Sequence, residues 1–425
     1  MYQKLYITIK GEEMINNVNE LTGKEWLHNA INFWTMDSDD IEAIYDKIKG
    51  FCYKDRTQVG YIKNIDDIIV KSADFTFNFV KSIHDAEESL KVIYMGQKKS
   101  YHIIFLENEF VQENFIFPFF TKNLIKYDVE YRGKIVVSNR ENDKIYYMLV
   151  FLKTCEDEIV ETTIDYPVSV KKNLEKPYII DTRSKMDKIG LKHPAPFSYI
   201  DIEKICRIND IRNKNILDPF LGVGSTIIGA YKENDVIGIE LNPEYVDLTY
   251  ERLDFLGINE ALNKSKIVCG NSLLEVKNIN EKFDVVITSP PYFNILKNKT
   301  SGVRTDSSQS RQGVEYYSES KEDIGNCDNY SEYLKSIKSL FEDINVKMNE
   351  NGEVYLIISD FTINKKETDI HSDCVRVLNE AGYVYCGTSY ILQNQKAIYP
   401  FGYPHKIVLN HIYQYIIKFR KEQLK

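Results

Sequence analysis

The sequence predicts an α/β fold, with a doubly wound parallel sheet and an additional N-terminal α+β module. From residue 181 onward, short apolar runs typical of strands alternate with helical segments, the pattern of a parallel sheet covered by helices. Two of these strands end in abrupt glycine or proline turns. Between residues 38 and 180, apolar runs alternate with polar turns instead, which indicates a separate strand-rich module.

The module 38–180 contains several expected strands. They cover residues 91–95, 102–106, 115–120, 133–138 and 145–152. No residues in this stretch have catalytic spacing, so its sequence predicts a fold but no chemistry.

The strands of the larger domain are expected to end near polar or turn-forming residues. Their expected ends are Leu217, Glu240, Val268, Thr288 and Ser359. A helix that begins near His371 is expected to end at Gly382, a glycine in the position that follows many helices. The last strand, 412–419, is expected to pair antiparallel at the edge of the sheet.

Length and composition limit the class of protein. The 425 residues exceed one typical domain and supply a sizeable core. The seven cysteines contain no C-x-x-C pair, so no metal site and no disulfide framework are expected. No apolar run approaches the roughly 20 residues that cross a bilayer, and the first residues lack a signal-peptide core, so the sequence predicts no membrane association and a cytoplasmic location.

A glycine turn follows the strand that ends near Leu217. The run 215–226 reads as strand, turn and helix start, with Gly222 and Gly224 in the turn. Glycine lets the backbone approach a ligand closely, and the first N–H groups of the following helix point at it. Ile227 replaces the third glycine of the dinucleotide fingerprint, and no Gly-Lys-Ser/Thr phosphate loop is present. The turn, together with Glu240 at the next strand end, therefore predicts a site for a nucleoside without a pyrophosphate.

The most specific pattern is Thr288-Ser289-Pro290-Pro291-Tyr292, which directly follows the apolar strand 283–287. The two prolines donate no backbone hydrogen bond and fix their own φ, so they form a rigid corner at the carboxyl end of a strand. Open α/β sheets bind ligands at such ends. The corner offers the Ser289 oxygen and the carbonyls of Ser289 and Pro290 as acceptors, beside the Tyr292 ring. These groups suit a planar ring that carries an exocyclic NH2.

Taken together, these motifs resemble those of the DNA amino-methyltransferases. The resemblance rests on 218–226, 237–245 and 288–292, and continues through 323–326 and 402–404. It covers most of residues 185–420 and a short piece near residue 25. This family methylates N4 of cytosine or N6 of adenine with S-adenosylmethionine, so the resemblance implies a Rossmann-like methyltransferase domain over residues 181–425.

The resemblance implies roles for the cofactor-binding residues. Asp218 is expected to meet the methionine amino group, and Glu240 the ribose diol. Asn271 stands where the family often has an aspartate for the adenine amino group. The other cofactor candidates are His193, Pro194, Phe220, Gly222, Gly224, Ser225, Thr226 and Thr288.

The predicted catalytic residues are Ser289, Pro290, Pro291 and Tyr292. The Ser289 side chain and the Pro290 carbonyl would accept hydrogen bonds from the target amine and aim its lone pair at the methyl group. Tyr292 would stack on a base flipped out of the duplex. A serine before the prolines is commoner in cytosine-N4 enzymes of this family, so N4 of cytosine is the preferred target and adenine N6 the alternative.

Double-stranded DNA is the expected partner, with a cognate restriction endonuclease as a second candidate in a prokaryotic or phage-like cytoplasm. A net charge of −9 is unusual for a DNA-binding domain, but phosphate contacts need only a local basic face. Its candidates lie in a long polar segment, 297–329, which is expected to form a flexible flap over substrate, with plain disorder as the alternative. They are Lys297, Lys299, Arg304 and Arg311.

The domain assignment has three parts. Residues 1–37 are assigned to a segment associated with the methyltransferase domain, and residues 38–180 to a module for target recognition, scaffolding or partner binding. Residues 181–425 form the catalytic domain. Two other functions are weighed against DNA methylation: an RNA or protein amide methyltransferase, and a non-catalytic DNA-binding regulator.

Overall fold

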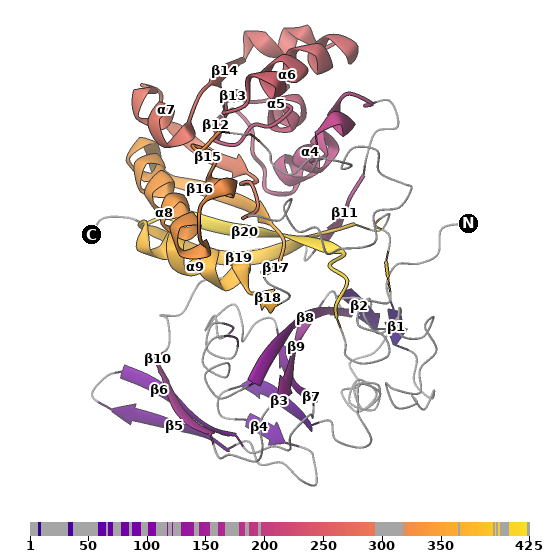
Figure 1. Cartoon of the computed structure of the whole chain (residues 1–425), viewed down its shortest axis with the longest axis vertical. Coiled ribbons are helices and arrows are strands. Elements are labelled where there is room, and N and C mark those ends of the chain that lie inside the picture. The colour runs from indigo at the N-terminus through magenta and orange to yellow at the C-terminus, as the bar shows by residue number, and fades with distance from the viewer. Residues whose placement is uncertain are drawn as a thin grey trace. The chain divides into compact units, whose positions relative to one another are not determined.

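The computed structural model divides the chain into two compact units (Figure 1). Unit 1 comprises Met1–Lys172, Asp360–Ser372 and Gln393–Tyr413, and unit 2 comprises Asn173–Ser359, Asp373–Leu392 and Gln414–Lys425. The structure describes residues 7–9, 33–36, 58–64, 67–70, 78–84, 87–94, 101–107, 117, 121, 129–139, 144–153, 160–165, 178–182, 187–193, 197–293, 318, 320–363, 366–393, 396, 398–399 and 408–422.

Within its described residues, unit 2 is built on an eight-stranded sheet with the order β11-β19-β20-β16-β15-β12-β13-β14. The strands are β11 (Tyr178–Ile180), β12 (Asn215–Asp218), β13 (Asp235–Glu240), β14 (Ser265–Cys269), β15 (Phe283–Thr288), β16 (Met348–Ile358), β19 (Tyr383–Leu392) and β20 (Tyr413–Lys421). The strands from β14 to β16 run parallel. The predicted strand ends are confirmed to within one residue.

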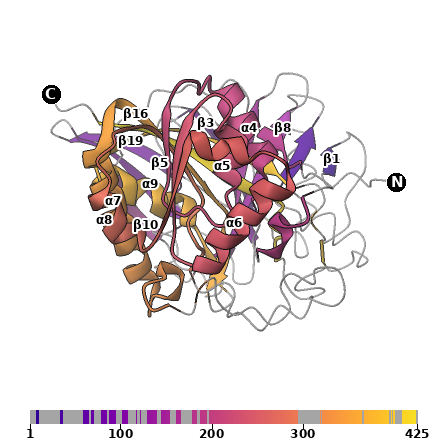
Figure 2. The same cartoon turned by 90° about the horizontal axis from the view of Figure 1, so that it is seen from above.

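Helices cover both faces of this sheet (Figures 1 and 2). One face carries α4 (Tyr199–Ile208), α5 (Ser225–Ala230) and α6 (Pro243–Phe255), and the other carries α7 (Ser272–Asn278), α8 (Tyr330–Lys347) and α9 (Ile370–Glu380). Gly382, with φ of 85°, follows α9 as predicted. The predicted fold class is therefore confirmed as a Rossmann-like, doubly wound α/β sheet.

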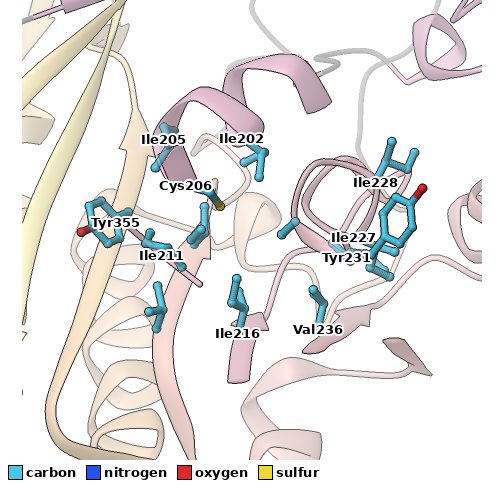
Figure 3. Close-up of a cluster of buried hydrophobic side chains, with 14 of the residues drawn as sticks. Ile202, Ile205, Cys206, Ile211, Ile216, Ile227, Ile228, Tyr231, Val236 and Tyr355 are labelled. Carbon is cyan, nitrogen blue, oxygen red and sulfur yellow. The ribbon is translucent and has the colours of Figure 1, made fainter. Parts of the chain in front are cut away.

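The core of unit 2 on the α4 and α5 side is dominated by isoleucine (Figure 3). Ile202 and Ile205 of α4 and Ile227 of α5 pack with Ile216 of β12 and Tyr355 of β16, and all five are at most 1% exposed. Each such aliphatic side chain contributes about 1.5–3 kcal/mol when it is fully buried. This packing holds the β12 strand end and the start of α5 in place, and both carry predicted site residues.

One prediction about the sheet is wrong. The last strand, β20, does pair antiparallel with β16, as expected. It does not lie at the edge, however, because β19 follows it in the sheet and β11 takes the edge position, parallel to β19. Burial explains the difference, since five of the nine β20 residues are buried and an edge strand would expose more of them.

In the part of unit 1 that the structure describes, most residues lie in strands. Its described residues form a seven-stranded sheet, β1-β2-β8-β9-β7-β3-β4, a three-stranded sheet, β10-β6-β5, and the pair β17-β18. The strands are β1 (Ile7–Ile9), β2 (Phe33–Met36), β3 (Gln58–Asn64), β4 (Asp67–Val70), β5 (Asn78–His84), β6 (Glu87–Tyr94), β7 (Tyr101–Glu107), β8 (Val129–Asn139), β9 (Ile145–Lys153), β10 (Val160–Asp165), β17 (Phe361–Ile363) and β18 (Lys366–Thr368).

The strand expected at 115–120 is wrong at its one described position. Phe117 is helical, and its carbonyl accepts a hydrogen bond from the Thr121 hydroxyl at 2.9 Å, four residues later. A short apolar run has no periodicity of its own that separates a strand from a buried helical turn, so the sequence pattern alone could not distinguish the two.

The compact units differ from the domain boundaries expected from the sequence. Strands β1 and β2, from the segment 1–37, pair parallel within the unit 1 sheet, where β2 lies beside β8. The stretches Asp360–Ser372 and Gln393–Tyr413 also belong to unit 1, although they lie far along the chain from the module 38–180. As a division of function, the expected boundaries stay a prediction. No helix in the described part of the chain is both long and apolar enough to span a bilayer.

Candidate active site

The carboxylate of Asp218 stands at the end of β12, buried and held by three donors. The hydroxyl of Thr226 donates to Oδ2 at 2.5 Å, and the Thr288 hydroxyl donates to Oδ1 at 2.7 Å. The backbone N–H of Phe220 also donates to Oδ1, at 3.0 Å. Burial raises the pKa of Asp218 to about 6, against the lowering effect of these donors. A carboxylate has about four acceptor positions, so one remains for a ligand.

The glycine turn after β12 needs both of its glycines. Gly222 and Gly224 have φ of 55° and 80°, a region that other L-residues rarely adopt. A Cβ at Gly224 would also collide with the Thr249 side chain. On the other side, a Cβ at Gly222 would lie 3.6 Å from Nε2 of His193, so that ring stands next to the turn.

The carboxylate of Glu240, at the end of β13, contacts the same turn. Its Oε2 accepts from the backbone N–H of Gly222 at 2.7 Å, and Oε1 accepts from that of Asn242 at 2.7 Å. Burial raises the pKa of Glu240 to about 7, and the nearby Asp218 and Asp323 carboxylates raise it further. Each oxygen keeps a second lone pair, which a ribose hydroxyl can use.

Other predicted cofactor residues surround these two carboxylates or support them. His193 packs its ring edge against Tyr245, with centroids 4.7 Å apart. Asn271 caps α7, where its side-chain oxygen accepts from Leu273 N–H at 3.0 Å. The Ser225 hydroxyl donates to the carbonyl of Phe197 at 2.5 Å, so it acts within the fold, as does the Thr226 hydroxyl through Asp218.

The proline corner follows β15, the strand next to β12. Because the Thr288 hydroxyl donates to Asp218, the corner begins directly beside the buried carboxylate. Ser289 is half-buried there, and Pro290 is buried. The Tyr292 hydroxyl lies 3.5 Å from Ser359 Oγ and accepts from Gln414 Nε2 at 3.2 Å, so its ring is tethered to β16 and β20.

A short turn packs against the corner from the other side. In η7 (Ile324–Asn326), the backbone N–H of Gly325 donates to Asp323 Oδ1 at 2.8 Å. A Cβ at Gly325 would lie 3.4 Å from Pro291 Cβ, an ordinary contact distance, so this turn lies directly against the corner. Asp323 is close enough to Glu240 and Tyr245 to raise the pKa of both. This turn therefore adjoins both the corner and the Glu240 carboxylate.

Several predicted residues lie outside the described residues. They are Pro194, Lys297, Lys299, Arg304 and Arg311. The basic DNA-contacting face and most of the flap 297–329 therefore stay predictions. No cluster of three or more His, Cys, Asp or Glu with metal-binding geometry occurs among the residues that the structure describes.

The sequence did not predict the residues that support the glycine turn. Arg252 of α6 is buried and donates to the Val223 carbonyl at 2.6 Å and to Asp187. The Thr249 hydroxyl lies 3.3 Å from the Gly222 carbonyl. Tyr245, Thr249 and Arg252 recur at helical spacing on α6, and a charged residue on this face of the helix was the signal available in the sequence.

The donor and acceptor set fits S-adenosylmethionine. Two carboxylates with raised pKa, the buried Asp218 and the half-buried Glu240, stand at neighbouring strand ends, each with an acceptor position to spare. One suits a cationic amino group and the other a ribose diol. The glycine turn between them brings backbone close to the same place.

Comparison with protein families gives two matches. The model of a DNA methylase family, the N6- and N4-methylases, matches residues 26–251. A second model, of RNA cap guanine-N2 methyltransferases, matches residues 213–300, which run from β12 past the proline corner.

Individual relatives are similar over shorter stretches. The type II methyltransferase M.ScaI of Streptomyces caespitosus is 38% identical over 73 residues, which is 17% of this chain and 23% of that protein. The orphan methyltransferase M.BamHII of Bacillus amyloliquefaciens is 36% identical over 76 residues, 17% of this chain and 27% of its own. The match thus spans only about a quarter of each relative.

Among solved structures, TrmN from Thermus thermophilus aligns with a TM-score of 0.32 at 12% identity, over 68% of this chain and 59% of that one. This TM-score is too low to establish a common fold. The DNA methylase model, in contrast, matches more than half of the 425 residues and includes Asp218, the glycine turn and Glu240. On this evidence, the chain belongs to the N6/N4 DNA methylase family.

Proposed function

We propose that this protein is an S-adenosylmethionine-dependent DNA methyltransferase that modifies an exocyclic amine, with N4 of cytosine as the preferred target. The observation that carries the proposal is the 2.7 Å hydrogen bond from Thr288 to Asp218. It joins the first residue of the proline corner to the carboxylate at the cofactor-side strand end. A reacting amine at the corner and a methyl donor over the glycine turn would therefore be neighbours.

The residues of the corner have a defined task in this reaction. When bound, S-adenosylmethionine supplies a methyl group on a sulfonium centre. The Ser289 hydroxyl oxygen and the Pro290 carbonyl would accept hydrogen bonds from the amine and so orient its lone pair, a contribution of position and electrostatics. Tyr292, with its hydroxyl held by Gln414, would offer its ring as a stacking surface for an extruded base.

The choice between cytosine and adenine rests on the serine before the prolines. Ser289 is the observation that favours cytosine N4, by resemblance to the family. Adenine N6 is the second candidate, and the breadth of the matching family, which includes both N4 and N6 methylases, supports either.

RNA is a further candidate substrate, because a model of RNA cap methyltransferases also matches. That match ends at residue 300 and lies within the half of unit 2 that holds the cofactor residues and the corner. DNA is favoured because the DNA methylase match also covers residues 26–212. One relative is named a type II methyltransferase and the other an orphan, so a cognate endonuclease stays a prediction.

The direct test is nucleoside mass spectrometry on DNA from cells that express the protein. N4-methylcytosine is the expected product, and N6-methyladenine would favour the second candidate. Duplex DNA, RNA and protein should also be offered separately to the purified chain with radiolabelled S-adenosylmethionine. Methyl transfer to RNA alone would overturn the proposal, and no cofactor binding would favour a non-catalytic DNA-binding protein.

The Ser289→Ala and Tyr292→Ala variants test the roles of the corner. Both should lower turnover by about 100-fold or more, the size of effect seen when a positioned hydrogen-bonding group is lost. Cofactor affinity should persist, because in this proposal Asp218 and Glu240 hold the cofactor and the two corner side chains contact the base. Tyr250→Ala, an exposed tyrosine on α6, is a matched control and should retain full turnover.

A further inference from the structure

A buried ion pair lies behind the predicted cofactor pocket, between Asp187 and Arg252. Arg252 Nε donates to Asp187 Oδ1 at 3.0 Å, and Nη2 donates to Oδ2 at 2.6 Å, a two-bond pairing that sets both position and orientation. The arginine side chain is 1% exposed. Asp187 Oδ1 also accepts from the backbone N–H of Gly190 at 3.1 Å.

The remaining arginine donors contact the glycine turn. Nη1 donates to the carbonyl of Val223 at 2.6 Å and to the Ser225 hydroxyl oxygen at 3.0 Å. The Ser225 hydroxyl in turn donates a hydrogen bond to the carbonyl of Phe197. These four hydrogen bonds use most of the five N–H donors that a guanidinium carries. One side chain therefore fixes the turn that holds Gly222 and Gly224.

The partner carboxylate fixes a second wall of the pocket. Asp187 anchors η4 (Gly190–Lys192) through Gly190, and His193 follows directly. The His193 ring stands beside Gly222 and against Tyr245. Moving Asp187 would therefore move His193 relative to the glycine turn.

Holding these segments together does not by itself require a buried pair. Lys192 and Glu251 join η4 to α6 at the surface, with 3.0 Å between Nζ and Oε1 and both side chains about half exposed. Burying an ion pair often gives no more stability than well-packed apolar residues of similar volume. What the buried pair adds is its set of bonds to the Val223 carbonyl and to Ser225, which the surface pair lacks.

We propose that the Asp187–Arg252 pair is the positioning element of the cofactor pocket, holding the glycine turn and His193 at the separation that cofactor binding requires. Neither residue touches the cofactor in this proposal. The inference rests on the proposed function, because the ligand of the pocket is taken to be S-adenosylmethionine.

The test compares a buried, charge-free replacement with the surface pair. In Asp187→Leu/Arg252→Met, apolar side chains of similar size replace the pair, so the fold should survive while the bonds to Val223 and Ser225 are lost. Calorimetry should then give a Kd for S-adenosylmethionine that is about 10- to 100-fold higher, as expected for a wall displaced by a fraction of an ångström to an ångström. In Lys192→Ala/Glu251→Ala the Kd should stay within about twofold.

Steady-state kinetics separates positioning from a purely structural role. The buried double variant should raise KM for S-adenosylmethionine, with kcat at saturating cofactor within about threefold of wild type and KM for DNA unchanged. A loss confined to stability would instead lower all activity in proportion to the unfolded fraction. Ile344→Ala, a core truncation in α8, supplies a control of reduced stability, and its KM for the cofactor should be normal.

Three outcomes decide the matter. A folded double variant with wild-type cofactor affinity overturns the inference alone. Wild-type protein that does not bind S-adenosylmethionine overturns the proposed function as well. If circular dichroism finds the double variant unfolded, the Kd of Arg252→Lys for S-adenosylmethionine is measured instead, and a wild-type value overturns the inference. Lysine keeps the charge but cannot reach Asp187 and Val223 together.

Discussion

Two buried aspartates, Asp218 in unit 2 and Asp369 in unit 1, have similar surroundings and opposite properties. Both are at most 5% exposed, and both accept hydrogen bonds from two hydroxyls, Thr226 and Thr288 in one case and Thr121 and Ser372 in the other. Yet burial raises the pKa of Asp218 to about 6, whereas the pKa of Asp369 falls to about 2.

The difference is a cation. Burial also raises the pKa of Asp369, but Lys134, whose Nζ lies 3.6 Å from Oδ1, offsets it together with His371 and the hydroxyls of Ser372 and Thr121. For Asp218, the described residues provide no ion pair. An aspartate that is paired with a lysine of the same protein has a structural role. A buried aspartate without such a partner favours a cationic ligand. The methionine amino group of the cofactor would fill that place.

The largest effect, a loss of folding stability, is expected from Lys134→Met in unit 1. It leaves Asp369 buried without its cation, so the free energy of unfolding should fall by about 3–5 kcal/mol. Urea unfolding measures this. Adding Asp369→Asn, which keeps a capping side chain at the start of α9, should recover most of the loss. A single variant as stable as wild type would show that the pair contributes nothing.

The matching change in unit 2 is Asp218→Asn, and it should act on binding instead. Cofactor affinity should fall by about 2–3 kcal/mol, roughly 30- to 150-fold, because a charged acceptor is lost. The free energy of unfolding at pH 8 should change by less than about 1 kcal/mol or increase, since a buried carboxylate without a cation is removed. Calorimetry and urea unfolding of the same preparation test both. A strongly destabilised variant with normal affinity would reverse the comparison.

The contributions of the two regions to the free energy of unfolding should depend on pH with opposite sign. Raised pKa values mean that folded Asp218 and Glu240 hold protons that the unfolded chain releases, so their contribution to stability is complete below about pH 4 and is lost as pH rises to about 7. The contribution of Asp369 is present above about pH 4 and is lost as pH falls to about 2.

Cofactor binding should follow the ionised carboxylates. Below about pH 6, affinity should fall by about tenfold per pH unit for each carboxylate that must be charged. Glu240→Gln should make the pH profile shallower, and calorimetry across the range checks it. A flat wild-type profile would mean that neither carboxylate meets the ligand in its charged form.

The smallest effect is expected from single hydroxyls. Thr288→Val removes one donor to Asp218 and should cost about 1 kcal/mol of cofactor affinity, roughly fivefold. Thr121→Val removes the corresponding donor to Asp369 and should cost a similar amount of unfolding free energy, with cofactor affinity unchanged. Equal effects of both variants on cofactor affinity would argue against the distinction between the two aspartates.

Much of the candidate site could be predicted because it lies where strands end. Hydrophobic runs bounded by turn residues place Asp218, Glu240 and Thr288 at the carboxyl ends of strands, and parallel neighbouring strands bring such ends together. The glycine turn was equally readable, since Gly222 and Gly224 adopt a positive φ that their neighbours cannot. The chemical roles of these residues remain proposals.

The sequence by itself determined the alternation of strands and helices, the strand ends and the two turns, because these depend on side chains within a few residues of one another. Only the tertiary structure decided that β20 lies inside the sheet, that Arg252 pairs with Asp187, and that Lys134 forms an ion pair with Asp369. Many lysines and arginines could pair with many carboxylates, and no local pattern chooses among them. Packing selects the partners, because it alone determines which distant charges are buried side by side.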